Sequence, residues 1–463
     1  MSTVLDEPQL QLLRQRVRGD VLAPGDATYD AARQVYNAMI DRRPAALARC
    51  RTVGDVIAAV GFARETGLDV AIRGGGHNGA GLGTVDSGLV IDLGEMNGVR
   101  IDPERRLATV EAGALLGDLD HAAHAFGLAT PAGIISTTGV AGLTLGGGHG
   151  YLSRKYGMTI DNLVSADVVL ADGSFVTADE DRHEDLFWAL RGGGGNFGVV
   201  TSFTLRLHPV STIVGGPMLW SLDDAGAVLR WYREFQPAVS DDVYGFFAFL
   251  TVPPAPPFPE DLHRKRMCGI VWCCTCSERE AEELAFAPAR KVARPALDGV
   301  QPMPYPMLQS AFDALYPRGD QWYWRGDFVR DVPDEAVTRH LEFAEQLPSL
   351  QSTMHLYPVD GAVQRVGSDA TAFSYRDATW SQVIVGVDHD PASASILRDW
   401  TVAYWEALHP FNERGGYVNF LMDEGQDRVR ATYRGNYDRL ARVKAVYDPG
   451  NLFHVNQNIH PGA

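Results

Sequence analysis

Three glycine-rich segments in the first 200 residues carry the strongest chemical signal in the sequence. They read RGGGHNGAGLG at 73–83, GLTLGGGHGYLSRKY at 142–156 and RGGGGNFGV at 191–199. Glycine lets the backbone approach a ligand closely and aim successive N–H groups at phosphate oxygens. Three such loops in one region predict a site for a dinucleotide, because its pyrophosphate and its ring both need close backbone contact.

The first loop formally matches the GxGxxG dinucleotide fingerprint at Gly74, Gly76 and Gly79. That fingerprint needs a helix directly after the glycines, so that the helix N-terminus meets the pyrophosphate. Residues 77–88 hold four more glycines, show no helical periodicity and lead into another strand. The sequence therefore predicts a cradle of loops rather than a Rossmann turn.

The elements that position these loops change character along the chain. In the first 208 residues, helices are predicted at 53–67, 115–126 and 183–191, and strands at 68–72, 89–93, 107–111, 164–170 and 199–207. Aromatic, alternating strands follow at 244–249, 321–324 and 354–357, between helices at 223–235, 279–291, 333–347 and 391–408. A helix at 427–446 belongs to a tail that resembles the first region.

This order predicts an α+β fold with a bipartite domain. Residues 1–208 and 411–463 form one domain. The middle domain, 209–410, is an antiparallel sheet backed by helices.

Charge and cysteine usage limit the partners. The 58 acidic and 41 basic residues give a formal charge of -17, which repels nucleic acid and anionic lipid. The first 20 residues predict a short amphipathic helix instead of a signal peptide, and no apolar run reaches the roughly 18 residues of a membrane span. We expect a cytoplasmic monomer or homodimer without a metal site. The five cysteines, an odd number, are expected to be free thiols.

Several motifs together resemble the berberine bridge enzyme-like oxidases, which belong to the vanillyl-alcohol oxidase superfamily with its PCMH-type FAD-binding domain. The motifs are RGGGHN at 73–78, GGGHGYLSRKYG at 146–157, DN at 161–162, RGGGGNFG at 191–198, YVNF at 417–420, YDPGNLF at 447–453 and NQN at 456–458. The resemblance runs from residue 37 to residue 460. Taken together, these motifs are highly specific.

The resemblance implies that FAD is the cofactor and that a ring nitrogen of His77 bonds to its 8α-methyl carbon. Histidine can be neutral near physiological pH and then offers a nucleophilic nitrogen. The flavin contacts that the resemblance implies are His77, Arg73, Gly74, Gly75, Gly76, Asn78, Gly79, Ile135, Thr138, Gly139, Gly142, Gly147, Gly148, Gly150, Tyr151, Gly198, Val199, Val200, Tyr417, Asn419, Asn456 and Asn458. The residues leave open whether His149 contacts flavin or solvent.

Two positions modify the family pattern. Many members bond the flavin a second time through a cysteine, and Ile135 stands at that position here. A single covalent attachment is therefore expected. Thr138 falls where the family places a gate to the oxygen pocket, and its size, close to that of valine, predicts access for oxygen.

The proton acceptor is the least defined part of the site. Some relatives use the second aromatic residue of a Tyr-x-Asn-Tyr motif, which here is Phe420 and has no acidic proton. On the central strand of the substrate domain, the family often has an acid or an amide, and a rough alignment places His355 at that position. Tyr357 shares the strand face of His355. A reference pKa near 6.5 suits histidine to general base work. Tyr323 and Tyr375 are further candidates.

The leading hypothesis is an oxidase that takes a hydride from a small alcohol, amine or secondary metabolite and passes the electrons to oxygen. The aromatic residues Trp272, Trp322, Trp324 and Phe249 favour a flat, apolar substrate over a simple sugar. Alternatives are an enzyme that oxygenates or cyclises its substrate through a flavin–oxygen adduct, a dehydrogenase with another acceptor, and a non-catalytic flavin-binding protein.

Overall fold

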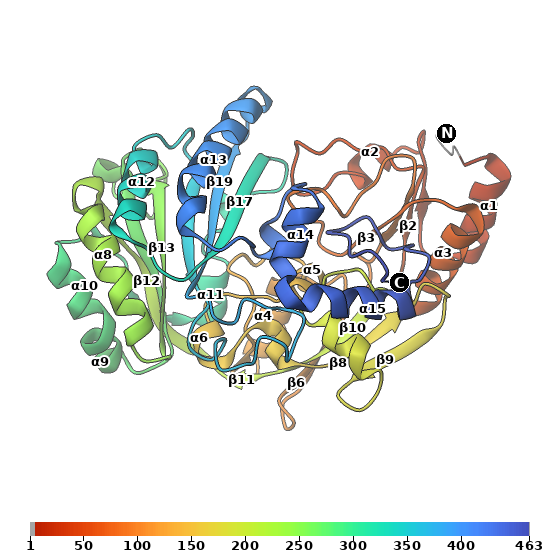
Figure 1. Ribbon diagram of the computed structural model, residues 1–463, viewed down its shortest axis with the longest axis horizontal. Helices are drawn as coiled ribbons and strands as arrows, with labels where there is room; N and C mark the ends of the chain where they lie inside the picture. Colours follow the sequence, from red (N-terminus) through yellow and green to blue (C-terminus); the bar gives the residue numbers. More distant parts are fainter. Residues whose placement is uncertain (1–4, 463) are drawn as a thin grey trace.

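The computed structural model describes residues 5–462. Figure 1 shows two halves: the largest sheet and its helices lie on the left, and two smaller sheets and both chain termini lie on the right. The first small sheet has the order β1 (Val21–Leu22), β2 (Ala46–Arg49), β4 (Leu89–Asp92) and β3 (Val70–Arg73), with β2, β4 and β3 parallel. Helices α1 (Glu7–Arg16), α2 (Tyr29–Ala32) and α3 (Val53–Thr66) belong to this region.

Helix α3 shows how local sequence sets an element. The Thr52 side chain accepts a hydrogen bond from the backbone N–H of Asp55 at the start of the helix. The helix ends at Gly67, whose φ of 69° is in the left-handed region that glycine adopts without strain. The predicted helix at 53–67 and the strand after it are confirmed.

The second small sheet is antiparallel throughout. Its order is β5 (Val99–Asp102), β6 (Leu107–Glu111), β10 (Val199–Arg206), β8 (Leu163–Val169) and β9 (Phe175–Asp179). Around it lie α4 (Leu116–His124), α5 (Val140–Gly146), α6 (Ser153–Tyr156) and α7 (Glu184–Leu190), and β7 (Leu128–Ala129) pairs with β11 (His208–Pro209).

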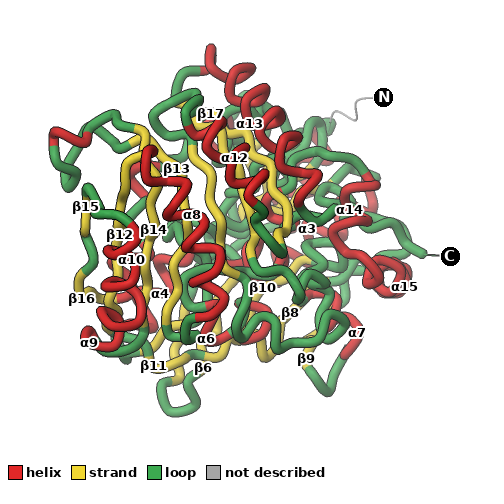
Figure 2. Tube along the Cα trace, turned by 60° about the vertical axis from the view of Figure 1, so that its left-hand side comes forward, coloured by secondary structure: helices red, strands yellow, loops and turns green. Residues whose placement is uncertain are grey.

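The large sheet has eight antiparallel strands. The order is β15 (Leu297–Asp298), β12 (Thr212–Ser221), β14 (Arg266–Cys274), β13 (Val243–Thr251), β18 (Thr353–Pro358), β19 (Trp380–Asp388) and β17 (Gln321–Val329), and β16 (Gln301–Pro304) pairs with β12. Helices α8 (Leu222–Ala238), α12 (Asp334–Ala344) and α13 (Ala394–Leu408) cover one face (Figure 2). The antiparallel sheet backed by helices is therefore confirmed, and its other face is left to meet the first half.

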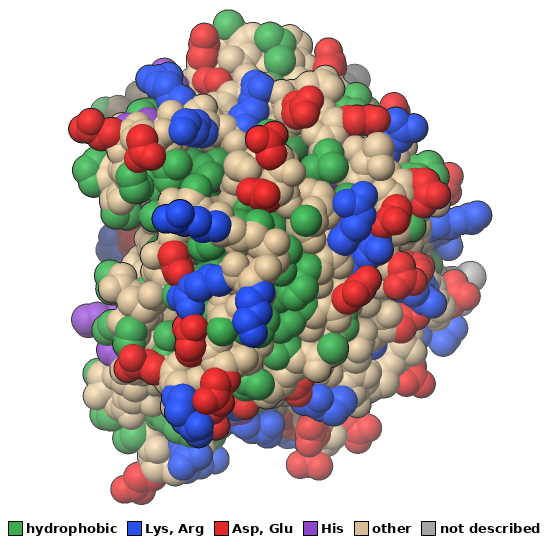
Figure 3. Space-filling model, turned by 90° about the vertical axis from the view of Figure 1, so that its left-hand side faces the viewer, with side chains coloured by type: hydrophobic (Ala, Val, Ile, Leu, Met, Phe, Trp, Pro, Cys, Tyr) green, Lys and Arg blue, Asp and Glu red, His purple; other side chains and the backbone are tan. Residues whose placement is uncertain are grey.

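The outer, helical side of the large sheet mixes both signs of charge. Figure 3 shows acidic and basic side chains interspersed there, with hydrophobic side chains between them. One such group is Arg230 and Arg233 against Asp334. Within residues 5–462 no helix combines the length and the apolar character needed to cross a membrane. The five cysteines are free thiols, and all except Cys276 are buried.

The tail returns to the first half. One hydrophobic core contains Leu190 and Phe197 together with Leu440 and Ile459, so both ends of the chain pack into it. The single helix predicted at 427–446 is wrong: α14 (Gln426–Tyr433) and α15 (Tyr437–Tyr447) are separated at Arg434, which has a φ of 47°. The domain limits 1–208, 209–410 and 411–463 stay a proposal.

The helix predicted at 279–291 is divided as well. It consists of α9 (Glu278–Ala281), a π-helical segment Glu282–Phe286 and α10 (Ala287–Val292), which follow one another without a gap. The short helix α11 (Tyr305–Gln309) precedes β17. The divided helix at 278–292 lies at the left-hand edge of the molecule in Figure 1, away from the glycine loops.

Candidate functional site

A cavity lies where the glycine loops meet the inner face of the large sheet. Its wall is formed by residues from the 73–83, 133–145 and 194–200 segments, from β17, β18 and β19, and from the tail at 417–420 and 453–457. Among the described residues that line it, only Arg73 has a formally charged side chain. The Arg73 guanidinium donates to the Asp92 carboxylate over 2.7 Å, so that charge is paired outside the cavity.

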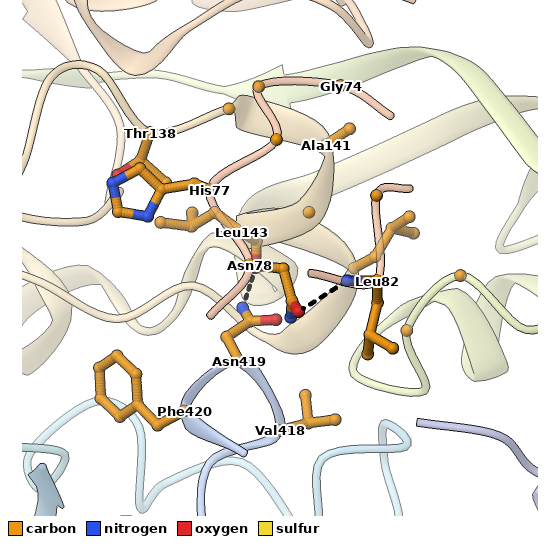
Figure 4. A pocket seen from close by; sticks show the side chains of 18 of the residues that line it. Gly74, His77, Asn78, Leu82, Thr138, Ala141, Leu143, Val418, Asn419 and Phe420 are labelled. Carbon is orange, nitrogen blue, oxygen red and sulfur yellow. Dashed lines mark hydrogen bonds between the residues drawn. The ribbon is translucent and has the colours of Figure 1, made fainter. Parts of the chain in front are cut away.

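Two glycines explain how closely the first glycine loop approaches the 133–145 segment. A Cβ added to Gly75 would lie 2.6 Å from the Gly139 nitrogen, and one added to Gly139 would lie 2.5 Å from the Gly75 nitrogen. No real Cβ makes such contacts, so both positions require glycine. The loops therefore form one continuous wall, in which His77 and Thr138 come side by side (Figure 4).

Two other glycines leave space for a ligand. Gly142 and Gly195 line the cavity, and a Cβ at either would meet no heavy atom within 4 Å. Side chains there would project into a space that the protein does not fill. Glycine loops with this property fit a cofactor with a pyrophosphate and a flat ring, for which backbone N–H groups act as hydrogen-bond donors.

His77 stands in this wall with its ring held from one side. Its imidazole stacks on the Tyr36 ring at a centroid distance of 3.8 Å and an interplanar angle of 21°. Burial, with a smaller contribution from Arg318, lowers the pKa of His77 to about 4, so the ring is neutral at physiological pH. Its Nε2 atom is buried and has no hydrogen-bond partner in the protein. A neutral ring with an unpartnered nitrogen fits a residue that bonds to a ligand.

The part of the cavity wall that the large sheet forms is apolar and partly aromatic. Trp322 and Trp324 of β17 and Val383 and Val385 of β19 line it. On β18, the Tyr357 hydroxyl and the Nδ1 atom of His355 form a short hydrogen bond, since the two side chains share one strand face. Burial lowers the pKa of His355 to about 3 and raises that of Tyr357 well above its ordinary value.

The tail fixes the second glycine run. The Tyr417 hydroxyl accepts hydrogen bonds from the Gly148 N–H at 2.8 Å and from the Asn419 side-chain amide at 2.9 Å. Asn419 also donates to the Leu143 carbonyl at 3.3 Å. Phe420 lies next to Asn419 on the same tail segment (Figure 4). The tail motif therefore both lines the cavity and holds the loop opposite.

His149 is the main site residue to which sequence reasoning gave no role. It lines the cavity, and its ring centroid lies 4.5 Å from Tyr417, 5.3 Å from Tyr357 and 5.6 Å from Phe420. Both ring nitrogens are buried without partners, and burial lowers its pKa to about 3. A bulky ring inside a run of glycines was the signal for it.

Of the predicted catalytic residues, His355, Tyr357 and Thr138 line the cavity, whereas Tyr323 and Tyr375 do not. Tyr323 lies between Trp322 and Trp324, so strand alternation turns it toward the face where Arg325 reaches its hydroxyl at 3.5 Å. Tyr375 stacks on Phe328 and donates to the Ala431 carbonyl at 3.0 Å. Neither tyrosine lines this cavity, so both are corrected as catalytic candidates.

Most of the predicted flavin contacts also line the cavity, but some support it from behind. Gly79 lies against the Trp324 ring, where a Cβ would come within 2.2 Å of a ring carbon. Tyr151 is buried beside Tyr244. The predicted contacts outside the cavity wall are Gly79, Gly147, Gly148, Gly150, Tyr151, Val199 and Asn458.

Comparisons with known proteins indicate a family of FAD-binding proteins. Residues 44–179 match the "FAD binding domain" family and residues 416–460 match the "Berberine and berberine like" family. The chain is 31% identical to an uncharacterized FAD-linked oxidoreductase, YgaK, of Bacillus subtilis, covering 97% of this chain and 98% of that one. It is 30% identical to a xylooligosaccharide oxidase of Thermothelomyces thermophilus, with 92% and 89% covered.

A solved structure gives the same result. The crystal structure of 6-hydroxy-D-nicotine oxidase from Arthrobacter nicotinovorans superposes with a TM-score of 0.86 at 27% identity, covering 96% of this chain and 98% of that one. The fold and the site define a flavoprotein of the PCMH-type FAD-binding class. The chain belongs to the berberine bridge enzyme-like family of FAD-linked oxidoreductases, and it is an FAD-linked oxidase.

Proposed function

We propose that this protein holds FAD covalently through His77 and oxidises a small, uncharged aromatic or alicyclic alcohol or amine, with dioxygen as the electron acceptor. The observation that carries the proposal is one cavity whose wall includes the glycine loops and His77 together with Trp322, Trp324, His355 and Tyr357. FAD supplies the hydride acceptor and the route of electrons to oxygen. The protein positions the substrate, excludes water from the site and provides groups that can accept or donate the proton.

The attachment is proposed to be single. His77 has a neutral ring and an unpartnered Nε2. Ile135 lines the same cavity and has no nucleophilic atom. Thr138, which stands beside His77 (Figure 4), falls where the family resemblance places a gate to the oxygen pocket, and its small side chain would leave that gate open.

The uncharged substrate follows from the wall. In the described part of the chain, no carboxylate or ammonium group lines the cavity, and burial keeps the imidazoles of His149 and His355 neutral. A buried ion without a partner costs several kcal/mol. An amine substrate is therefore expected to bind as the free base. An alcohol substrate is expected to carry no charged group near its hydroxyl.

The same wall favours an aromatic or alicyclic skeleton. Trp322, Trp324, Val383 and Val385 offer flat apolar contacts and few hydrogen-bond partners. An oligosaccharide would leave many hydroxyls unpaired against such a surface. Two relatives are named for their substrates, a 6-hydroxy-D-nicotine oxidase and a xylooligosaccharide oxidase. The aromatic hydroxynicotine is chemically closer to this wall than the oligosaccharide.

The first experiment is anaerobic reduction of the purified protein followed by mixing with oxygenated buffer. Rapid return of the oxidised flavin spectrum with one equivalent of hydrogen peroxide is expected for an oxidase. Slow return would refute dioxygen as the acceptor and indicate a dehydrogenase. Denaturation of wild-type protein and His77→Ala tests the tether, because flavin should stay only on the wild-type polypeptide.

A further inference from the structure

Tyr36 lies against the proposed attachment residue and is anchored in three directions. Its ring is buried and stacks on His77 at 3.8 Å. Its hydroxyl donates to the Tyr316 carbonyl at 2.7 Å, and its N–H donates to the Gly76 carbonyl at 3.0 Å. The Gly319 N–H donates to the Tyr36 carbonyl at 3.0 Å. The ring cannot move without breaking contacts to both halves of the molecule.

The Tyr36 ring also contacts Trp322, at a centroid distance of 4.9 Å and an interplanar angle of 36°. The next residue, Asn37, donates to the Gly79 carbonyl at 2.7 Å and to the Trp322 carbonyl at 2.9 Å, and it accepts from the Trp322 N–H at 3.0 Å. Residues 36 and 37 therefore connect the histidine loop to strand β17 of the large sheet.

This anchorage meets a need that the histidine loop creates. His77 follows three consecutive glycines, and Gly79 comes two residues later, so local sequence does little to fix the imidazole. Forming one bond at one carbon atom requires a ring that is already oriented, because a misplaced reactant loses orders of magnitude in rate. Tyr36 provides a flat, rigid surface for that ring and keeps it in the buried environment where it is neutral.

We propose that Tyr36 is the positioning residue for flavin attachment, acting through His77. The inference rests on the proposed covalent link. In that step a ring nitrogen of His77 bonds to the 8α-carbon, while the imidazole N–H bond and one C–H bond at that carbon break. The two electrons and both protons stay with the flavin until dioxygen removes them as hydrogen peroxide.

The test compares substitutions at Tyr36 with a matched position. Tyr36→Phe keeps the stacking ring, and Tyr36→Met keeps apolar volume but offers no flat face. Tyr29→Met is the control, because Tyr29 is also a buried tyrosine in the same half whose hydroxyl donates to a carbonyl, that of Pro44, at 2.6 Å. Full-length apoprotein from riboflavin-starved cells is mixed with FAD in air. Covalent flavin is followed by fluorescence of the denatured band and total bound flavin by absorbance.

We expect Tyr36→Met to attach flavin at least about tenfold more slowly than wild type while it still binds FAD. Tyr36→Phe and Tyr29→Met should stay within about threefold of wild type. If Tyr36→Met yields no soluble protein, Tyr36→Leu replaces it and is expected to show the same slowing of flavin attachment. Attachment by both Tyr36 variants at the wild-type rate would overturn the positioning role alone.

Two further outcomes separate this inference from the function on which it rests. Slowing in Tyr29→Met equal to that in Tyr36→Met would assign the effect to general loss of stability and overturn the positioning role. Wild-type protein without covalent flavin would refute the link through His77, and the role of Tyr36 with it.

Discussion

Replacing Gly142 by alanine adds one methyl group, which should raise the stability of the ligand-free protein and lower its affinity for FAD. It lies inside helix α5, lines the cavity, and a Cβ there would meet nothing within 4 Å. Alanine therefore meets no steric obstacle in the ligand-free protein. Because alanine is the better helix former, Gly142→Ala should stabilise the ligand-free protein by about 0.5–1 kcal/mol. The same methyl group enters the space that we assign to FAD.

The expected loss of affinity follows from overpacking. One extra methyl group in a well-packed site costs about 1–3 kcal/mol. That corresponds to a rise in the Kd for FAD of roughly 5- to 150-fold. The measurement is a titration by flavin fluorescence in a His77→Ala background, where binding is reversible, together with thermal unfolding of the ligand-free protein.

Two glycines serve as controls. Gly61 lies in helix α3, away from the cavity, and also has nothing within 4 Å of a Cβ, so Gly61→Ala should gain stability without losing FAD affinity. Gly75→Ala should destabilise even the ligand-free protein, since its Cβ would meet the Gly139 backbone at 2.6 Å. Wild-type FAD affinity in Gly142→Ala would refute the view that the cofactor passes this glycine.

Three further predictions concern buried polar groups. Tyr357→Phe leaves His355 Nδ1 without its partner, and we expect about 1–3 kcal/mol lower stability by denaturant unfolding and slower turnover. Lys444→Met leaves the buried Asp448 carboxylate unpaired, which should cost about 3–5 kcal/mol and also free the Asn196 carbonyl that Lys444 holds at 2.6 Å. Burial lowers the pKa of His149 to about 3, so its contribution to stability should be full above pH 6.5 and fall toward pH 3. His149→Gln should reduce the slope of the free energy of unfolding against pH in this range by about 1.4 kcal/mol per pH unit.

The sign of the pH effect follows from proton binding. Below the ordinary histidine pKa of 6.5, the unfolded chain takes up a proton that buried His149 does not, so lower pH favours unfolding. An unchanged slope in His149→Gln would contradict the buried, neutral state of this ring. For Lys444→Met, recovery of stability in the Lys444→Met, Asp448→Asn double variant is expected, and its absence would argue against an unpaired charge as the cause.

The sequence alone determined the features that depend on short-range rules. The predicted helix at 53–67 is observed as α3 at 53–66, with Gly67 as its cap, since capping and left-handed glycine act within a few residues. Glycine runs can also be read locally, because only glycine permits the close backbone approach seen between Gly75 and Gly139. The order of predicted helices and strands gave the α+β fold class, and the family motifs then indicated FAD.

Tertiary structure decided which side of an element faces the cavity. Tyr323 and Tyr375 looked as suitable as Tyr357 in sequence, but strand alternation and packing turned them away. Arg434 breaks the tail helix because it adopts a positive φ while it pairs with Asp377 and Glu413, which lie far away in sequence.

The same reason explains the residues that sequence reasoning left without a role. Tyr36 meets His77 and also the Tyr316 carbonyl, which is 280 positions away in the sequence. His149 meets Phe420 and Tyr357 only when the tail and the large sheet close over the second glycine run. Local sequence determines where the backbone can bend and which groups are available, and the packing of distant segments determines which of those groups share a cavity.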